Sequence, residues 1–180
     1  MDHSEVVRCL DEGTILLGVD RAGARKFFTD LGLRQISHLT GEVPYIEWLV
    51  VRSSFLLAPL CVLGSLGCAV PAFHWYAILV GPLAVLLFAY WWCTSPLGNR
   101  RSGWSALLLA GAVSSVFTSA GPYIKLWLIL TTAGLFLVRL TYSAAALLLR
   151  GFVIRNPRAY DLCAKHGVVI VQETNQGTLL

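Results

Sequence analysis

The sequence predicts an all-α membrane protein with four transmembrane helices in two hairpins, and a small α/β cytoplasmic cap formed by the N- and C-terminal segments. Three observations support this prediction. Of the 180 residues, 56% are hydrophobic and only 13% are charged, about half the charged share of a typical soluble domain. Residues 53–99 and 102–124 contain no charged side chain, and each stretch is too long for a helix of a soluble core. Polar segments with strand and helix-cap patterns flank this apolar region.

The apolar region divides into four spans, because crossing a bilayer takes about 20 apolar residues. The turn residues Pro71–His74 separate the first two spans, and Gly121–Pro122 separate the last two. The predicted spans lie at about 53–70, 75–93, 104–120 and 123–149. The domains are then an N-terminal cytoplasmic segment at 1–47, a four-span domain at 48–149 and a C-terminal helix–strand tail at 150–180.

Basic residues in the short loops predict the orientation, because Lys and Arg close to span ends stay in the cytoplasm. Arg100 and Arg101 place the second loop inside, and an even number of spans then places both termini inside. We therefore expect a multi-pass protein of the plasma or inner membrane. Four arginines are expected to contact the phosphates of the inner leaflet: Arg100, Arg101, Arg150 and Arg155.

The N-terminal segment is predicted to form a helix, a strand and a second helix. Ser4 is the expected cap of the first helix, which ends near Gly13, and residues 14–19 have the composition of a strand. Asp20 is the expected cap of the second helix, which ends near Gly32.

The C-terminal segment is predicted to contain a helix followed by a strand. Asn156 precedes Pro157 at the expected first helical position, Gly167 is expected to end the helix, and residues 168–171 form a strand. A strand this short is not stable alone in water. We therefore expect it to pair with the strand at 14–19, within one chain or between subunits.

The central region lacks acidic residues, because no Asp or Glu occurs from residue 48 to residue 160. Proton relays and cation filters commonly use carboxylates, so a cation or proton pathway is disfavoured. Arg139 lies well inside the fourth span. It could reach the inner-leaflet phosphates or hydrogen-bond to a neighbouring helix, or it could belong to an anion or lipid-headgroup site. The candidate residues for such a site lie near one stripe of the helix: Lys125, Thr132, Arg139, Tyr142 and Ser143.

The third span is rich in small residues, which allow helices to approach closely in lipid. They could pack within the monomer, line a pore or form an oligomer interface, and we favour a homo-oligomer. The candidate interface residues are Ala106, Ala110, Gly111, Ser114, Ser115 and Thr118.

Enzymatic, metal-dependent and nucleic-acid functions have little support in the sequence. The four histidines are far apart in the chain and no catalytic or phosphate-binding motif occurs. The five cysteines lack a CxxC spacing, so we expect neither a metal site nor a cofactor. The N-terminal segment has more acids than bases and the C-terminal segment the reverse, which favours docking of the two termini over binding of nucleic acid.

Three functional hypotheses follow, and the least favoured is an interfacial lipid enzyme, for which only the acids Glu42 and Glu47 could serve at the inner membrane surface. The first is a non-enzymatic membrane component, assembled as an oligomer in the lipid bilayer. Its cytoplasmic cap, residues 1–47 and 150–180, would dock a soluble protein partner or sense a change in the membrane. The alternative is a small channel or transporter subunit that favours anions or anionic lipids, because the membrane region is basic and free of acids.

Overall fold

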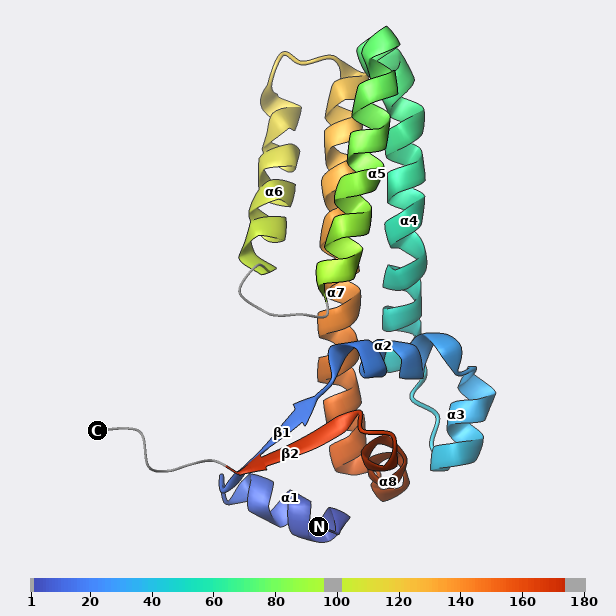
Figure 1. Ribbon diagram of the computed structural model, residues 1–180, viewed down its shortest axis with the longest axis vertical. Helices are drawn as coiled ribbons and strands as arrows, with labels where there is room; N and C mark the ends of the chain where they lie inside the picture. The colour runs from blue at the N-terminus through green and yellow to red at the C-terminus, as the bar shows by residue number, and fades with distance from the viewer. Residues whose placement is uncertain (1, 96–101, 174–180) are drawn as a thin grey trace, which may run out of the picture. The chain divides into compact units, whose positions relative to one another are not determined.

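The structure is a computed structural model that describes residues 2–95 and 102–173; it is mostly helical and contains a sheet of two strands (Figure 1). The α-helices are α1 (His3–Asp11), α2 (Arg21–Asp30), α3 (Leu33–Thr40), α4 (Tyr45–Phe73), α5 (Ala77–Thr94), α6 (Ser102–Ser114), α7 (Pro122–Arg155) and α8 (Pro157–Lys165). The strands are β1 (Ile15–Val19) and β2 (Val169–Glu173), and short 3₁₀ turns occur at His74–Tyr76 and Ser115–Phe117.

The chain folds into two compact units. The first, here called the terminal unit, combines Met1–Val51 with Ser143–Leu180, and the second, the helical unit, is Arg52–Tyr142. The boundaries between the units fall inside α4 and α7.

The terminal unit contains the two-stranded sheet. β1 and β2 pair antiparallel, with Leu17 opposite Val171 and Gly18 opposite Ile170. This confirms the predicted pairing of the N-terminal and C-terminal strands, and it occurs within one chain. Side chains alternate across the sheet as the pleat requires: Leu17 is buried, whereas Leu16 is 55% exposed.

Two of the predicted helix caps are confirmed. The carboxylate of Asp20 accepts hydrogen bonds from the backbone N–H groups of Ala22 (3.3 Å) and Gly23 (2.8 Å) at the start of α2. The side-chain oxygen of Asn156 accepts one from the N–H of Ala159 (3.0 Å) at the start of α8. Each bond satisfies an N–H group that has no partner inside its helix.

One predicted helix cap is wrong, and one helix was not predicted. The cap of α1 is Asp2 and not Ser4, because Asp2 is extended and its carboxylate accepts a hydrogen bond from the N–H of His3. Helix α2 ends at Asp30, close to Gly32 as expected, but Gly32 also caps a further helix, α3, and its N–H donates to the side chain of Gln35 at 2.9 Å. The sequence analysis therefore missed α3.

A hydrophobic core holds the terminal unit together. Phe28, Ile36, Leu149 and Phe152, which come from α2, α3 and α7, are each at most 1% exposed. The ring of Phe27 lies edge-on to Phe28 with 5.2 Å between centroids, and 6.4 Å from that of Phe152. Burial of each such side chain contributes about 1.5–3 kcal/mol, so the N-terminal and C-terminal segments stabilise each other.

In the helical unit, α4 and α5 form an antiparallel hairpin (Figure 1). Phe55 of α4 packs on Trp92 near the end of α5, with 5.4 Å between ring centroids. The predicted turn at residues 71–74 is shifted: Pro71 still belongs to α4, and the chain reverses at the 3₁₀ turn His74–Tyr76. His74 has a left-handed φ of 51° there, which ends the helix.

Helix α7 packs against α4 at Gly134. A Cβ atom added to Gly134 would lie 3.0 Å from a methyl group of Val62 and 3.3 Å from the backbone oxygen of Ala58. The hydroxyl of Thr141 also donates to that of Ser54 at 3.1 Å. Close approach of the two backbones therefore depends on glycine at position 134.

Gly134→Ala is expected to destabilise the helical unit by about 1–3 kcal/mol, because the added methyl group overpacks the contact with α4. Gly67→Ala is the matched control, since Gly67 is exposed on α4 and nothing lies within 4 Å of the position of its Cβ. Thermal denaturation of the detergent-solubilised protein, followed by circular dichroism, measures both. Equal melting temperatures for the two variants would contradict the close packing.

Two helical stretches are long and apolar enough to cross a membrane, Tyr45–Thr94 with a mean hydropathy of 2.0 and Pro122–Arg155 with 1.6. Only 22% of the most apolar window of the first stretch is buried, and 39% of the second. Core helices of a soluble domain would be mostly buried, so these values favour a membrane protein.

The predicted third span is not present as a helix of spanning length. In the described residues, α6 ends at Ser114 and only a 3₁₀ turn follows it. Its 13 residues extend over about 20 Å, less than the roughly 30 Å of a hydrocarbon core. The small residues that continue the apolar pattern to residue 120 do not continue the α-helix.

Candidate functional site

Arg139 lies in the interior of the helical unit. It is only 7% exposed, and its guanidinium carbon lies 4.5 Å from the ring centre of Trp91 on α5. A guanidinium over a tryptophan face is attracted by about 2 kcal/mol or more when both groups are desolvated. No Asp or Glu occurs in residues 52–142, so no carboxylate of this unit can form an ion pair with Arg139. Its side chain is packed between helices and does not extend to the surface.

Aromatic side chains surround this part of the helical unit. Trp92 lies 5.5 Å from Phe88 and 6.4 Å from Tyr142, measured between ring centroids. Tyr142 itself is buried, together with Ala58 and Val138. The arginine therefore lies beside a packed aromatic cluster that joins α4, α5 and α7.

The other residues of the predicted polar stripe have local roles. The ammonium group of Lys125 donates to the backbone oxygen of Val116 at 2.9 Å. The hydroxyl of Thr132 donates to the backbone oxygen of Leu128, one turn earlier in α7, at 2.8 Å. Ser143 is half-buried and belongs to the terminal unit. The structure thus places Arg139 and Tyr142 in one packed region, and does not join all five residues into one polar site.

The small residues of α6 are largely uncovered. Ala110, Gly111 and Ser114 are exposed, and the hydroxyl of Ser114 donates to the backbone oxygen of Gly111 at 2.7 Å. Ser115 is half-buried and Thr118 is exposed, whereas the side chain of Ala106 lies outside the described residues. Most of this face is therefore not packed against the rest of its own chain.

The basic residues that we expect at phosphates differ in their surroundings. Arg150 is exposed. Arg155 forms an ion pair with Glu47 at 2.8 Å and donates to the backbone oxygen of Gly151 at 3.1 Å. Arg100 and Arg101 lie outside the described residues. The nearest anion to Arg155 in the described structure is therefore a carboxylate of the protein.

Asn156 makes contacts that the sequence analysis did not predict. Its side-chain amide donates to the backbone oxygen of Thr40 (3.1 Å) and to a carboxylate oxygen of Glu42 (2.9 Å), while its side-chain oxygen caps α8. One buried side chain thus joins the segment after α3 to the corner between α7 and α8. The cap was visible in the sequence, but its partners are more than 100 residues away.

Asn156→Ala is expected to destabilise the terminal unit by about 2–3 kcal/mol, because it removes a helix cap and a hydrogen bond to a carboxylate. Urea denaturation of the full chain in detergent measures the change. Asn156→Asp keeps the cap acceptor but places a second carboxylate beside Glu42, so it should also be destabilising. Recovery of full stability by the aspartate variant would contradict the role given to Glu42.

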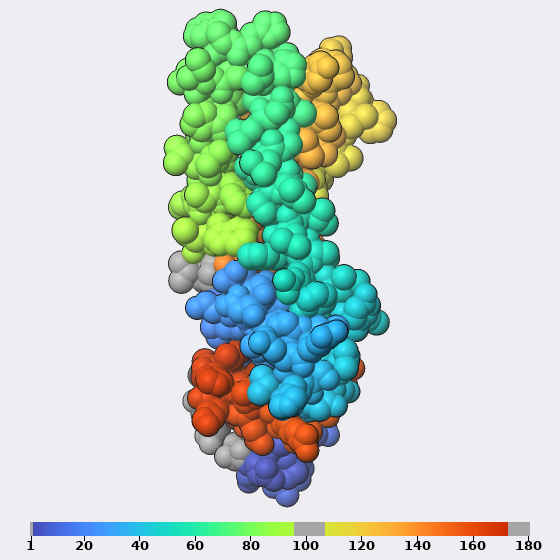
Figure 2. All heavy atoms as spheres, turned by 90° about the vertical axis from the view of Figure 1, so that its right-hand side faces the viewer, coloured from blue at the N-terminus to red at the C-terminus, as the bar shows by residue number. Residues whose placement is uncertain are grey.

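A groove of about 480 Å³ opens on the surface of the terminal unit, where α2, α3 and α8 meet. Its apolar lining includes Phe27, Leu31, Leu39 and Leu162. A second hollow of about 370 Å³ lies along α3 and shares Leu31 and Leu39 with the first. In Figure 2 the blue atoms of α3 lie directly beside the red atoms of α8.

The rim of the groove is polar, with Asp20, Lys26, Asp30 and His166. Cys163 also lines it, but burial raises the pKa of its thiol to about 12. The thiol therefore stays protonated at neutral pH and is a poor nucleophile. Among the described residues, no group of three or more His, Cys, Asp or Glu side chains could hold a metal ion.

No protein-family model matches the chain, and no match is found among curated proteins or solved structures.

Proposed function

We propose that the protein is a non-enzymatic, multi-pass membrane component whose terminal unit docks a soluble cytoplasmic partner. One observation carries the proposal: the terminal unit has its own hydrophobic core and a groove lined by apolar side chains. The same chain has two stretches apolar enough to cross a membrane. Concave apolar surfaces with a few polar groups are the usual form of binding sites.

The proposed topology has four crossings, with both termini in the cytoplasm. The antiparallel hairpin of α4 and α5 and the long apolar part of α7 support three of them. The short helix α6 would need either a thinned bilayer or flanking residues to complete the fourth. The orientation depends on Arg100, Arg101 and Arg150 under the rule that basic loops stay inside.

We also propose that the helical unit assembles as a homo-oligomer. The exposed small residues of α6, in particular Ala110, Gly111 and Ser114, support this because small faces associate in lipid. The native mass of the detergent-solubilised protein tests it, and a monomeric mass would contradict it.

The alternative function is a channel or transporter subunit for anions or anionic lipids. The acid-free helical unit favours it, but the burial of Arg139 against Trp91 favours a packing role for the one cation deep in α7. Flux of chloride into liposomes that contain the protein would have to depend on Arg139 for this alternative to hold.

Purification of the full chain from its native membrane tests the docking function. We expect a soluble protein to co-purify in a fixed ratio, and to be lost when residues 156–173 are deleted. Absence of any stoichiometric partner, together with Arg139-dependent chloride flux, would overturn the proposal in favour of the channel.

A further inference from the structure

We propose that the terminal unit contacts the headgroup layer of the inner leaflet through an interfacial patch on the first two turns of α4: Tyr45, Ile46, Leu49 and Val50. This inference rests on the proposed function as a membrane-crossing component. It adds a lipid-binding surface to the unit that is expected in the cytoplasm. It is carried by the exposed face of α4, by the length of that helix and by the charges beside the patch.

The interfacial patch is apolar and open. Its four side chains are between 40% and 71% exposed, and Ile46 is the most exposed of them. All four belong to the terminal unit, although they lie at the start of a helical stretch that is apolar enough to cross a membrane. Contiguous exposed apolar side chains of this kind mark a contact with a membrane or with another molecule.

The exposed face of α4 continues from the interfacial patch into the more apolar part of the helix. Large exposed side chains recur along it at helical spacing, at Ile46, Leu49, Leu56, Leu60 and Leu63. None of the exposed residues of α4 is charged. In the proposed topology Leu56, Leu60 and Leu63 face lipid, so the patch, on the same face of the same helix, is directed toward lipid as well.

The length of α4 places its first two turns at the level of the headgroups. Its 29 residues extend over about 43 Å, which matches the roughly 40–45 Å of a bilayer with both headgroup layers and exceeds the roughly 30 Å of the hydrocarbon core. Aromatic side chains, which favour membrane interfaces, lie at both ends: Tyr45 at the start, and Trp75 and Tyr76 in the turn that follows. With Tyr45 at the outer limit of the headgroups, Leu49 and Val50 lie about 6–8 Å further in, at the border of the hydrocarbon.

The position of Arg52 agrees with this depth. It follows Tyr45 by seven residues, so its Cα lies about 10 Å deeper along the helix, just inside the hydrocarbon. The residue is half-buried, and an arginine at that depth reaches the phosphates by extending its side chain toward the interface. If the hydrocarbon instead began at residue 53, as the sequence predicts, Ile46 would lie in water.

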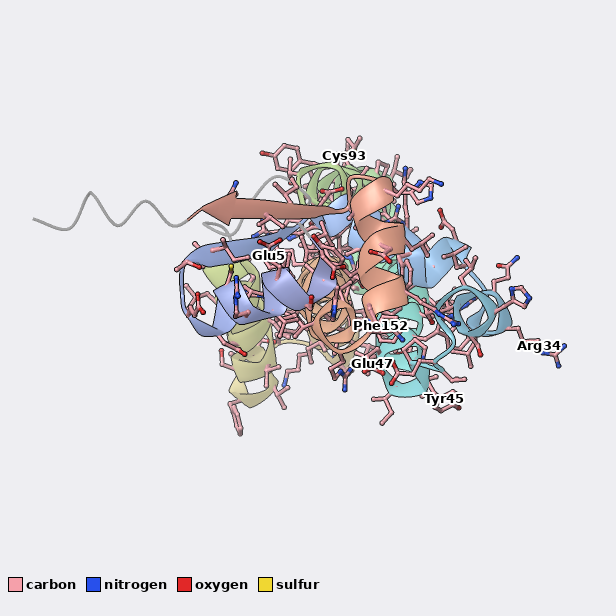
Figure 3. All side chains as sticks on the ribbon, turned by 90° about the horizontal axis from the view of Figure 1, so that it is seen from below. Glu5, Arg34, Tyr45, Glu47, Cys93 and Phe152 are labelled. Carbon is pink, nitrogen blue, oxygen red and sulfur yellow. The ribbon has the colours of Figure 1, made fainter. Side chains whose placement is uncertain are left out.

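The one acidic residue of α4 is directed away from the interfacial patch. Glu47 forms its ion pair with Arg155 of α7 at 2.8 Å. Figure 3 shows Glu47 on the side of α4 that faces α7 and Tyr45 on the side away from it. The side chain of Arg155 remains 63% exposed, and Arg150, which lies earlier in α7, is also exposed. Cations are therefore available to lipid phosphates beside the patch.

Glu42 lies outside the proposed contact. It precedes Tyr45 by three residues, on the water side of the expected headgroup limit. Its carboxylate accepts a hydrogen bond at 2.9 Å from the amide of Asn156, which is buried. The patch itself therefore brings no carboxylate into the headgroup layer.

Depth measurements with a fluorescent probe on single cysteines test the proposal. Ile46→Cys, Leu49→Cys and Leu56→Cys would be made in a full chain without its natural cysteines, labelled, and reconstituted into vesicles of phosphatidylcholine and phosphatidylglycerol. Lipids that carry a spin label on the headgroup or at a chosen acyl carbon quench the probe at defined depths, and iodide quenches it from water. We expect labelled headgroups to remove most of the emission at positions 46 and 49, and labelled acyl chains most of that at position 56. The probe at position 56 should lie about 15 Å deeper than that at position 46.

Leu16→Cys is the matched control, because Leu16 is an exposed leucine of the same unit on the outer face of the sheet. Iodide should quench this probe, and labelled lipids should not. All four positions are exposed, so the variants should keep the melting temperature of the cysteine-free chain. Equal quenching by iodide at positions 16, 46 and 49 would overturn the proposal. Protection of positions 46 and 49 from both quenchers, with energy transfer between labelled copies, would also overturn it and assign the patch to a second copy.

Failure of this inference differs from failure of the proposed function. Lipid quenching at position 56, with positions 46 and 49 in water, would keep the membrane-crossing helices and reject the interfacial patch alone. Equal quenching by iodide at positions 16 and 56 would reject the membrane component itself. Lipid quenching at the patch without any co-purifying soluble protein would reject only the docking function.

Discussion

Phe152→Ala is expected to destabilise the terminal unit by about 3–5 kcal/mol, the usual cost of a cavity left by a buried phenylalanine. Phe152 is 1% exposed, and its ring centroid lies 6.4 Å from that of Phe27 on α2. Since most single domains have only about 5–15 kcal/mol of total stability, this is a large part of the stability expected for the terminal unit. Urea denaturation of the detergent-solubilised chain, followed by tryptophan fluorescence, measures the change.

Leu147→Ala is the control for this prediction. Leu147 lies on the same helix and in the same unit but is 70% exposed, so its truncation should change stability by no more than about 0.5 kcal/mol. Equal losses for the two variants would show that α7 does not contribute Phe152 to a core shared with α2.

Arg139→Glu is expected to destabilise the helical unit by about 3–5 kcal/mol, because it leaves a buried charge without a favourable partner. A carboxylate over Trp91 would face the negative side of the aromatic ring. Arg139→Lys keeps the charge but loses the planar stacking, so we expect a smaller loss of about 1 kcal/mol. Size-exclusion chromatography of the detergent-solubilised protein after heating ranks the variants.

Arg139→Leu separates packing from function. It should leave assembly largely intact, since a hydrophobic side chain can replace a buried charged group at little cost. A stable Glu variant would contradict the packing of Arg139 on Trp91. A Leu variant that assembles normally but loses chloride flux or bound lipid would assign a functional site to Arg139.

Local signals in the sequence predicted the terminal unit well. Asp20 and Asn156 cap their helices within three residues, so neighbouring residues alone identify them. The two strands were expected to pair because neither is stable alone, and β1 and β2 do pair. Helix α3 was missed because a glycine commonly marks the end of a helix, whereas Gly32 also caps the start of the next one.

Contacts between distant segments could not be predicted in the same way. Trp91 and Arg139 lie on different helices, and nothing in the spacing of either residue indicates that they stack. The apolar lining of the groove combines Phe27 and Leu39 with Leu162 from the other end of the chain. Such a surface exists only after the N- and C-terminal segments have packed together. Apolar periodicity indicates which side of a helix is buried, but it does not indicate which other element packs against that side.

The most direct test of the account is the side of the membrane on which each part of the chain lies. Single cysteines would be introduced as Ser4→Cys, Lys165→Cys and Gly121→Cys into a chain without its natural cysteines, and labelled in sealed vesicles with a thiol reagent that does not cross membranes. The account predicts that the first two variants are labelled only from the cytoplasmic side and Gly121→Cys only from the opposite side. Labelling of all three from one side, or extraction of the protein from the membrane by alkaline carbonate, would contradict a membrane-crossing helical unit that carries a cytoplasmic docking unit.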